Sequence, residues 1–506
     1  MNHFITLLLL ILAAPYSKGC TTFIVGRDVT VDGSVMSSHS NDGDGDTAGN
    51  LQKIRPKQHA TNASRVVSGG SVPQVNYTYG YFTKVGGYAS LSENQVALAE
   101  STCSSIFSGK RSDKSVLNIV DLSELGLERG QNAEDTIRIM GSLVEKYGYY
   151  DAGESLLVSD PQDAWIFHVS PDDTQTSAIW AAQRVPSDHV AVVANMFVIR
   201  EINLTSSNDY MYSKNLLDVA ERSTSWTRDQ KTLDFTALFS GPEGRKYVSG
   251  RRMWIVLSTL SVETFSSEYD DYVLNAPYPA TAKAKIQSVD ISNMTSLMRN
   301  YYKGTPYDLS GDVLAAGPFS SPFRAAANAN QTKFFERSIS TPRSIVSYVT
   351  HVSSHFSSSK LATLWFAFHA AHTSIYIPFV VGMTQLPVSH TNNSLVNVDR
   401  GIGGFNAARF VFNIAQIHFD LAIQDIRSEQ DRLESESQAL VHSLKSSTKN
   451  MSSIGELLRE NAAKNVKAWW DLSDLILLHY ADGYCNNCGH GPRHIGYPTW
   501  WLNKVL

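Results

Sequence analysis

The N-terminal segment says more than any other part of the sequence about where this chain is sent and which residue begins the mature protein. An apolar stretch runs from Phe4 to Ala14, about eleven residues, which is signal-peptide length and well short of the ~20 residues that span a bilayer. Ser17 and Gly19 then supply the small residues that precede a signal-peptidase cut. We therefore expect residues 1–19 to be a signal peptide and Cys20 to be the first residue of the exported chain.

This expectation has a chemical consequence for Cys20. A free α-amine has a pKa of about 8, so at neutral pH it can accept the proton of a thiol on the same residue. One residue then supplies both a nucleophile and a general base. A cysteine soon after a cleavage site also serves in disulfides, so its position alone leaves both roles open.

Composition narrows the class of protein. The 506 residues are 42% hydrophobic and 18% charged, which is enough to bury a large core and argues against disorder. The net charge of −5 comes without a long run of either sign, so we expect no nucleic-acid partner. No other segment has the length and apolarity of a membrane span, so stable membrane insertion is not expected.

The predicted location is secreted or lysosomal. The chain carries seven Asn-X-Ser/Thr sequons, which suit passage through a eukaryotic secretory pathway. The candidate glycosylation sites are Asn62, Asn76, Asn203, Asn293, Asn330, Asn392 and Asn450.

A β-hairpin is predicted directly after Cys20. Residues 21–25 are β-branched and aromatic, as in a buried strand, and Asp32-Gly33 is a hairpin turn signal. An antiparallel return strand would bring residues 38–42 back towards Cys20.

The rest of the pattern favours an α+β layered architecture over regular βαβ units. Further strands are expected at 77–84, 95–100, 155–159, 164–168 and 190–194. The clearest helix covers Asn132–Tyr147, with Asn132 as N-cap and Gly148 as a stop signal. From about Asn413 to Tyr480 the chain is predominantly helical, with a capping box predicted at Ser453–Glu456.

Five blocks of the sequence form a recognisable series. They are CTTFIVGRDVTVDGSV with SHSND from Cys20 on, ELGLERGQNAEDTIRIMGSLVEKYG (124–148), GESLLVSDPQDAWIFHV (153–169), YYKGTPYDL (301–309) with AGPFSSP (316–322), and LWFAFHAAHTSIYIPFVVG (364–382). In content and order these blocks resemble peptidase family C69, dipeptidase-like members of the N-terminal-nucleophile hydrolase superfamily.

The resemblance implies a four-layer αββα sandwich over residues 20–420, with Cys20 at an edge of a central sheet. Residues 421–506 would form a mainly helical C-terminal region packed on this catalytic domain. That region could cover the active site, mediate association or complete the core, and a homo-oligomer is left open.

The resemblance also implies a reaction and its residues. The Cys20 thiolate would attack an amide carbonyl of a dipeptide or another small amide, with its α-amine as general base, through an acyl-enzyme and without metal or cofactor. Asp42 matches the acid that orients the α-amine, and Asn195 the asparagine that stabilises the oxyanion. Arg252, rather than Arg251, is favoured as the arginine whose charge promotes the thiolate.

One position departs from the related amidases, which carry an arginine three residues before the Asp42 position. Here that residue is His39. A histidine that titrates near pH 6.5 is a poor substitute for a permanent charge, so the substrate class stays open. We expect His39 and Arg251 to contribute to substrate binding. The alternatives to a dipeptidase are an N-acyl amidase on the same fold and a non-enzymatic secreted glycoprotein that retains the fold.

The other three cysteines are expected to be a buried thiol and a disulfide pair. Cys103 is expected to be a buried thiol. Cys485 and Cys488, followed by His490 and His494, match a zinc ligand set in composition, but four ligands within ten residues leave little chain to fold around an ion. A local disulfide between Cys485 and Cys488 is favoured in an oxidising compartment.

Overall fold

The computed structural model describes residues 19–43, 47–205, 208–241, 246–268, 277–311, 316–322, 336–447, 449–489 and 493–506. The predicted signal peptide up to residue 18, the sequon at Asn330 and His490 lie outside these ranges. Within them, no helix has both the length and the apolarity that a bilayer crossing requires.

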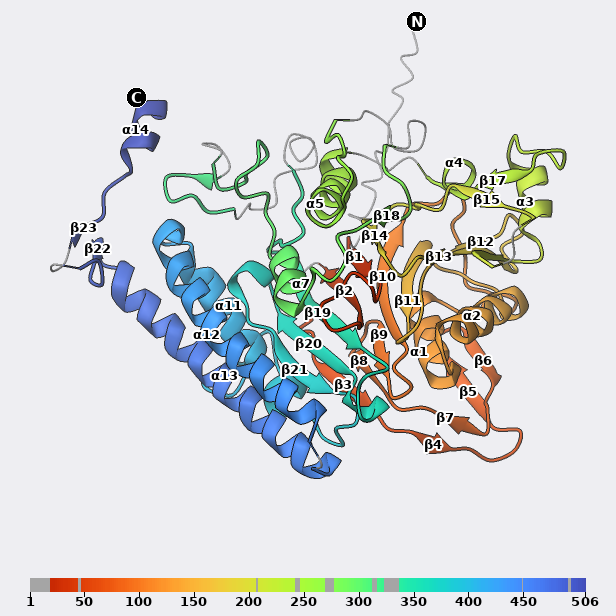
Figure 1. Ribbon diagram of the computed structural model, residues 1–506, viewed down its shortest axis with the longest axis horizontal. Helices are drawn as coiled ribbons and strands as arrows, with labels where there is room; N and C mark the ends of the chain where they lie inside the picture. Colours follow the sequence, from red (N-terminus) through yellow and green to blue (C-terminus); the bar gives the residue numbers. More distant parts are fainter. Residues whose placement is uncertain are drawn as a thin grey trace, which may run out of the picture.

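Two stacked antiparallel sheets form the centre of the molecule (Figure 1). The first has the strand order β18-β14-β1-β2-β19-β20-β21. Its strands are β1 (Thr21–Val25), β2 (Val35–Asp42), β14 (His189–Val193), β18 (Ala282–Lys283), β19 (Ser344–Val352), β20 (Thr363–Phe368) and β21 (Ile377–Val380). All residues of β1, β2, β19, β20 and β21 are buried, so this sheet is covered on both faces.

The second sheet has the strand order β16-β13-β12-β11-β10-β9-β8-β3. Its strands are β3 (Leu51–Ile54), β8 (Tyr81–Lys84), β9 (Ala89–Ser92), β10 (Ala97–Cys103), β11 (Gly153–Ser159), β12 (Ala164–Pro171), β13 (Ala178–Val185) and β16 (Tyr210–Tyr212). β10 packs against both β1 and β2 of the first sheet. This contact places the middle of the second sheet directly against the N-terminal hairpin.

Helices cover the outer face of each sheet (Figure 1). α1 (Ile119–Arg129) and α2 (Ala133–Tyr147) pack on the second sheet. The first sheet is covered by α5 (Arg251–Leu260), α7 (Ile291–Met298), α11 (Gly404–Ala415), α12 (Phe419–Lys445) and α13 (Met451–Tyr480). The predicted α+β fold, a four-layer αββα sandwich, is confirmed.

Short elements complete the chain. They are β4 (Lys57–Gln58), β5 (Ser64–Val67), β6 (Gly70–Pro73), β7 (Tyr77–Thr78), β15 (Glu201–Asn203), β17 (Thr232–Asp234), β22 (Tyr484–Cys485), β23 (Arg493–His494), α3 (Leu216–Ser223), α4 (Phe235–Phe239), α10 (Val388–Thr391) and α14 (Thr499–Val505). A π-helical turn (Lys246–Gly250) precedes α5, and 3₁₀ turns lie at Ser359–Leu361 and Ala371–Thr373.

Local sequence signals predicted some elements well and others poorly. The predicted helix is α2, with the Asn132 side chain accepting from the Asp135 N–H and Gly148 at a φ of +70°. The expected strand 77–84 is instead two strands, because β7 pairs with β4 and β8 pairs with β3.

The predicted capping box in the C-terminal region is wrong. α13 begins three residues earlier than expected, at Met451, because the extended Asn450 is its N-cap and accepts a hydrogen bond from the Ser453 N–H. Ser453 therefore lies in the first turn of the helix. Its backbone N–H is one of the donors that the Asn450 side chain caps, and Ser453 is not itself the N-cap.

α12 and α13 run side by side along the first sheet (Figure 1). Arg299, at the end of α7, donates to both carboxylate oxygens of Glu434 on α12, and Glu434 also accepts from the Tyr376 N–H at 2.8 Å. This buried pair attaches the C-terminal helices to the core. The expected domain boundary after residue 420 lies within the first turn of α12.

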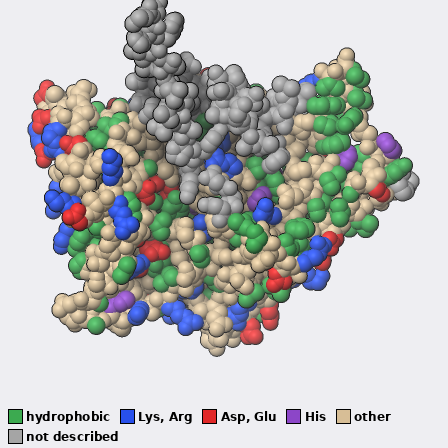
Figure 2. Space-filling view, turned by 180° about the vertical axis from the view of Figure 1, so that it is seen from behind, with side chains coloured by type: hydrophobic (Ala, Val, Ile, Leu, Met, Phe, Trp, Pro, Cys, Tyr) green, Lys and Arg blue, Asp and Glu red, His purple; other side chains and the backbone are tan. Residues whose placement is uncertain are grey.

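Beyond α13 the chain extends from the body as β22, β23 and α14 (Figure 1). Cys485 and Cys488 form a disulfide there. Figure 2 shows hydrophobic side chains gathered at this end, where Tyr497, Val505 and Leu506 are exposed.

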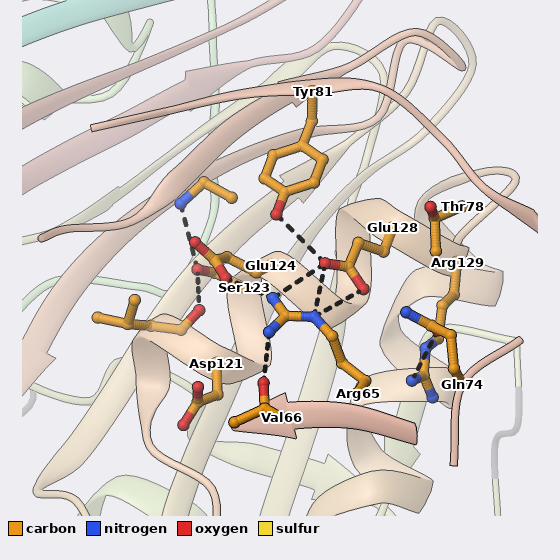
Figure 3. A network of polar contacts seen from close by, with 12 residues as sticks. Arg65, Val66, Gln74, Thr78, Tyr81, Asp121, Ser123, Glu124, Glu128 and Arg129 are labelled. Carbon is orange, nitrogen blue, oxygen red and sulfur yellow. Dashed lines mark hydrogen bonds and ion pairs between the residues drawn. The ribbon is translucent and has the colours of Figure 1, made fainter. Parts of the chain in front are cut away.

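A polar network attaches the β5–β6 hairpin to α1 (Figure 3). Arg65 of β5 donates through Nη2 to Glu124 Oε2 at 2.7 Å and through Nε to Glu128 Oε1 at 3.0 Å. The Tyr81 hydroxyl donates to Glu128 Oε1 at 3.3 Å. The Glu128 side chain is only 7% exposed, so its charge depends on Arg65 for compensation.

Replacing Arg65 by Met should lower the free energy of unfolding by roughly 2–3 kcal/mol, since it leaves two partly buried carboxylates without their cation. Urea unfolding at pH 7 measures the loss. Arg138→Met is the matched control, because the Arg138–Glu134 pair is an exposed i,i+4 pair and should cost less than about 0.5 kcal/mol. Equal losses in both variants would refute a special role for this network.

Several histidines are buried in neutral form. Burial lowers the pKa to about 3 for His39, His168, His369, His372 and His390. In the unfolded chain a histidine titrates near 6.5, so below that pH the unfolded state binds more protons than the native state. The free energy of unfolding therefore falls as the pH drops from about 6.5 towards 3.

His390, packed against the rings of Phe368 and Phe379, offers a test of this effect. The loss of stability between pH 7 and pH 5 should be about 2 kcal/mol smaller in His390→Gln than in the parent protein, because glutamine does not titrate. Urea unfolding at both pH values measures it. His442→Gln, on the exposed face of α12, should leave the pH dependence unchanged. Identical pH dependence in His390→Gln and the parent would contradict the assignment.

Candidate active site

Cys20 lies directly before β1 and its side chain is fully buried. β1 is an interior strand of the first sheet, between β14 and β2. Cys20 therefore lies at the end of a central strand and not on an edge strand. β10 of the second sheet passes close by, and Ser101 Oγ donates to the Cys20 carbonyl oxygen at 3.4 Å. Asn41 Nδ2 lies 4.0 Å from Cys20 Sγ. The stacked sheets therefore surround Cys20 with side chains from both layers.

Arg252 connects Cys20 to Asn195. It lies in the first turn of α5 and is fully buried. Its Nη1 donates to the Cys20 carbonyl oxygen and to Thr21 Oγ1, both at 2.8 Å, and its Nη2 donates to Asn195 Oδ1 at 2.7 Å. Burial, followed by the charge of Arg337, lowers the pKa of Arg252 to about 9, so it remains a cation at neutral pH.

Arg251, its neighbour in the sequence, faces elsewhere. Consecutive residues of a helix point about 100° apart. Arg251 pairs with Glu336 Oε1 at 3.1 Å, and its guanidinium stacks 3.4 Å from the centre of the Tyr307 ring. Of the two arginines, Arg252 is the one that contacts Cys20.

Asn195 follows β14 and adopts a left-handed backbone with φ of +62°, which asparagine tolerates better than most residues. Its Oδ1 accepts from Arg252, and its Nδ2 donates to the Thr102 carbonyl oxygen at 2.7 Å. A carboxamide nitrogen carries two hydrogens, so one remains for a further acceptor. The side chain is fixed in orientation while one donor stays available.

Asp42 lies at the end of β2, on the return strand of the predicted hairpin, where Ser40 is opposite Thr21. Its Oδ1 accepts from Ser344 Oγ at 2.8 Å and its Oδ2 from Arg337 Nη2 at 2.7 Å. The same Arg337 nitrogen donates to the Gly19 carbonyl oxygen at 2.7 Å. A Cβ on Gly19 would collide with this guanidinium. Asp42 therefore lies beside the Gly19–Cys20 peptide bond.

His39 is buried between the sheets, opposite Thr22. Its Nδ1 forms a 2.7 Å hydrogen bond with the Glu100 carbonyl oxygen. Because burial lowers the pKa of His39 to about 3, the ring is neutral at physiological pH. The position that carries an arginine in related amidases thus supplies no charge here.

Glu100 and Arg337 were not predicted as site residues. Glu100 is fully buried in β10, and its Oε1 accepts from Thr102 Oγ1 at 2.9 Å. An acidic residue directly after the apolar residues 96–99 of a predicted strand is a signal that could have identified it. Arg337 precedes β19 in a segment without strand or helix periodicity, so no local pattern distinguished it.

The effect of the site on the Cys20 thiol differs from the sequence-based expectation. Burial, followed by the charges of Glu100 and Asp42, raises the pKa of Cys20 well above its usual range. Arg252 does not reverse this, because it donates to the Cys20 backbone oxygen rather than to Sγ. With Gly19 attached, the thiol is therefore protonated at neutral pH.

Comparisons with known proteins identify the family of this chain. The family model of peptidase family C69 matches residues 19–432. The chain belongs to peptidase family C69. This C69 peptidase therefore hydrolyses peptide or amide bonds, and the alternative of a non-enzymatic glycoprotein is set aside.

Relatives of this C69 peptidase are similar over most of their length. The "Probable dipeptidase" of Latilactobacillus sakei is 22% identical over 72% of this chain and 74% of its own. The "Probable dipeptidase A" of Streptococcus pyogenes serotype M3 (strain SSI-1) is 21% identical over 84% of this chain and 89% of its own. Among solved structures, penicillin V acylase from Agrobacterium tumefaciens covers 72% of this chain and 87% of its own, with 16% identity and a TM-score of 0.35.

The remaining predicted residues are a buried cysteine and the asparagines of the sequons. Cys103 is a buried thiol at the end of β10. The six described sequon asparagines are all exposed, and they are Asn62, Asn76, Asn203, Asn293, Asn392 and Asn450.

The adjacent arginines of α5 form a matched pair for testing the site. Arg252→Gln should lower kcat/KM for peptide hydrolysis by about 100-fold or more, because it removes the contacts that position Cys20 and Asn195. Arg251→Gln should lower kcat/KM by about 10-fold or less. Steady-state kinetics, with thermal unfolding of both variants as a check on folding, measures the difference. A larger loss in Arg251→Gln would reverse the assignment.

Proposed function

We propose that this C69 peptidase is a dipeptidase that uses the mature N-terminal Cys20 as its nucleophile and the α-amine of Cys20 as general base. The observation that carries the proposal is the double contact of Arg337, which holds both the Gly19 carbonyl oxygen and the Asp42 carboxylate. Cleavage after Gly19 would release an α-amine close to that carboxylate. Asp42 can then hold and orient the amine.

The raised pKa of the Cys20 thiol makes a neighbouring base necessary. A free α-amine with a pKa of about 8 meets this need, since it belongs to the same residue as the thiol. In the attack, the amine accepts the thiol proton and the sulfur forms a bond to the substrate carbonyl carbon. The amine then returns the proton to the departing amine, which leaves a thioester on Cys20.

The remaining Asn195 Nδ2 hydrogen would stabilise the negatively charged oxygen of the tetrahedral intermediate. Such a donor contributes roughly 3–4 kcal/mol to the transition state. Arg252 fixes the Asn195 side chain from its other end. In the second half of the reaction, water attacks the thioester and the same α-amine serves as base, which regenerates free Cys20.

One observation favours a dipeptide over an N-acyl amide as the substrate. The relatives given above carry the name dipeptidase.

Export is part of the proposal. The apolar leader, the exposed sequons and the Cys485–Cys488 disulfide suit a secreted or lysosomal glycoprotein. Treatment of the protein from a eukaryotic host with an N-glycosidase should lower its mass, and a single unchanged mass would argue against glycosylation.

The decisive test is the identity of the first residue. Mass spectrometry of the active protein should find Cys20 at the N-terminus, and Cys20→Ala should reduce hydrolysis of a dipeptide panel to background. Cys103→Ala is the control and should retain activity, because the buried Cys103 thiol donates to the Ser101 carbonyl oxygen and not to Cys20. An active protein that begins at any other residue cannot use the proposed base. Faster turnover of N-acyl amides than of dipeptides would reassign the substrate.

A further inference from the structure

Three side chains of metal-ligating type lie together at Cys20. Cys20 Sγ, a ring nitrogen of His39 and a carboxylate oxygen of Glu100 all lie within 4.8 Å of one another. They come from three different strands or strand ends, and each residue is at most 1% exposed. We infer that Cys20, His39 and Glu100 form a zinc site whose occupation inactivates the enzyme.

The three types of ligand atom, sulfur, nitrogen and oxygen, favour zinc. A thiolate, an imidazole and a carboxylate are the three side-chain ligands that Zn²⁺ uses, whereas Mg²⁺ and Ca²⁺ require oxygen ligands. Zinc–ligand bonds of about 2.0–2.3 Å place neighbouring ligands of a tetrahedral site roughly 3.5 Å apart. The observed grouping therefore needs side-chain adjustments of only about 1 Å to close around the ion.

The hydrogen bond of His39 prepares the ring for coordination. The partner of Nδ1 is a carbonyl oxygen, which can only accept, so Nδ1 carries the proton and Nε2 carries the lone pair. Zinc-bound histidines characteristically donate their second ring nitrogen in this way to a carbonyl or carboxylate. No other hydrogen bond of the His39 ring occurs among the described residues.

Glu100 provides an independent observation. Its Oε1 accepts from Thr102, and its carboxyl also lies within hydrogen-bond reach of the Cys20 thiol and of the Glu154 carboxyl. Burial raises the pKa of both Glu100 and Glu154, so the two neighbouring carboxyls are held partly by a shared proton. A cation bound here would replace that proton and compensate the charge of the buried carboxylates.

The fourth ligand comes from maturation, and in this respect the inference rests on the proposed function. Release of the Cys20 α-amine gives a nitrogen and a sulfur on one residue, which can bind one ion in a five-membered chelate ring. Zn²⁺ would displace the thiol proton to solvent and form bonds to Sγ and the amine nitrogen. The nucleophile and its base are then both occupied, so hydrolysis stops until a chelator removes the ion.

Co²⁺ is a suitable probe because a cobalt–thiolate bond has a charge-transfer absorption. Mature, chelator-treated enzyme should develop this band with one equivalent of Co²⁺, and Zn²⁺ should abolish it. Zn²⁺ should also inhibit dipeptide hydrolysis, with recovery upon addition of a chelator. In Glu100→Gln and His39→Gln, the affinity for Zn²⁺ should fall by about 100-fold.

Matched controls address the other cysteines. Cys103→Ala changes a cysteine three residues from Glu100 on the same strand. The double variant Cys485→Ala/Cys488→Ala removes the C-terminal disulfide. Both variants should bind Zn²⁺ with the same affinity as the unsubstituted enzyme. Loss of zinc inhibition in the Cys485→Ala/Cys488→Ala variant, or unchanged affinity in both Glu100→Gln and His39→Gln, would overturn the inference.

A measurement on the unsubstituted enzyme covers the case in which a variant does not fold. Zn²⁺ should slow the alkylation of Cys20 by iodoacetamide, as followed by mass spectrometry of the N-terminal peptide. Protection without any dipeptide hydrolysis would support the zinc site and refute the dipeptidase function. Dipeptide hydrolysis with unprotected Cys20 would support the function and refute the zinc site.

Discussion

The buried guanidinium of Arg252 is the interaction on which the site depends. It binds the backbone of Cys20, the hydroxyl of Thr21, the side chain of Asn195 and, through Nε, the Val248 carbonyl oxygen. Among the described residues its partners are all neutral oxygens, so dipoles rather than an opposite charge compensate its burial. Asp42 instead pairs with Arg337 and accepts a hydrogen bond from Ser344.

The packing of the two sheets against each other fixes the positions of the side chains around Cys20. Cys20 and Asp42 belong to the hairpin of the first sheet, whereas Ser101 and Glu100 belong to a strand of the second sheet. Residues on extended, fully buried strands have little freedom, because each backbone is held on both sides by neighbouring strands. Arg252 comes from a helix that packs on the first sheet, so three layers of the sandwich contribute contacts to one residue, Cys20.

Local sequence patterns predicted the features that depend on near neighbours. The hairpin after Cys20 and the helix α2 follow from turn residues, β-branched residues and capping signals within a few positions of each other. The choice between Arg251 and Arg252 needed the starting angle of α5, which no local pattern supplies. Glu100 and Arg337 approach Cys20 only because distant strands pair, and that pairing is set by the whole core. The resemblance to peptidase family C69 supplied the fold where periodicity could not.

The raised pKa of the Cys20 thiol also follows from long-range packing rather than from local sequence. A nearby arginine suggested a more acidic thiol, but the direction of a shift depends on which atom the cation reaches. Arg252 reaches a backbone oxygen, while burial and two carboxylates act on the sulfur itself. Burial and these charges keep the thiol in its neutral form.

Gly19 lies tightly against the Arg337 guanidinium. A Cβ at this position would come within 2.0–2.3 Å of three guanidinium atoms, so the Arg337 side chain would have to move. Because the same guanidinium pairs with Asp42, a larger residue before Cys20 would also change the surroundings of that carboxylate.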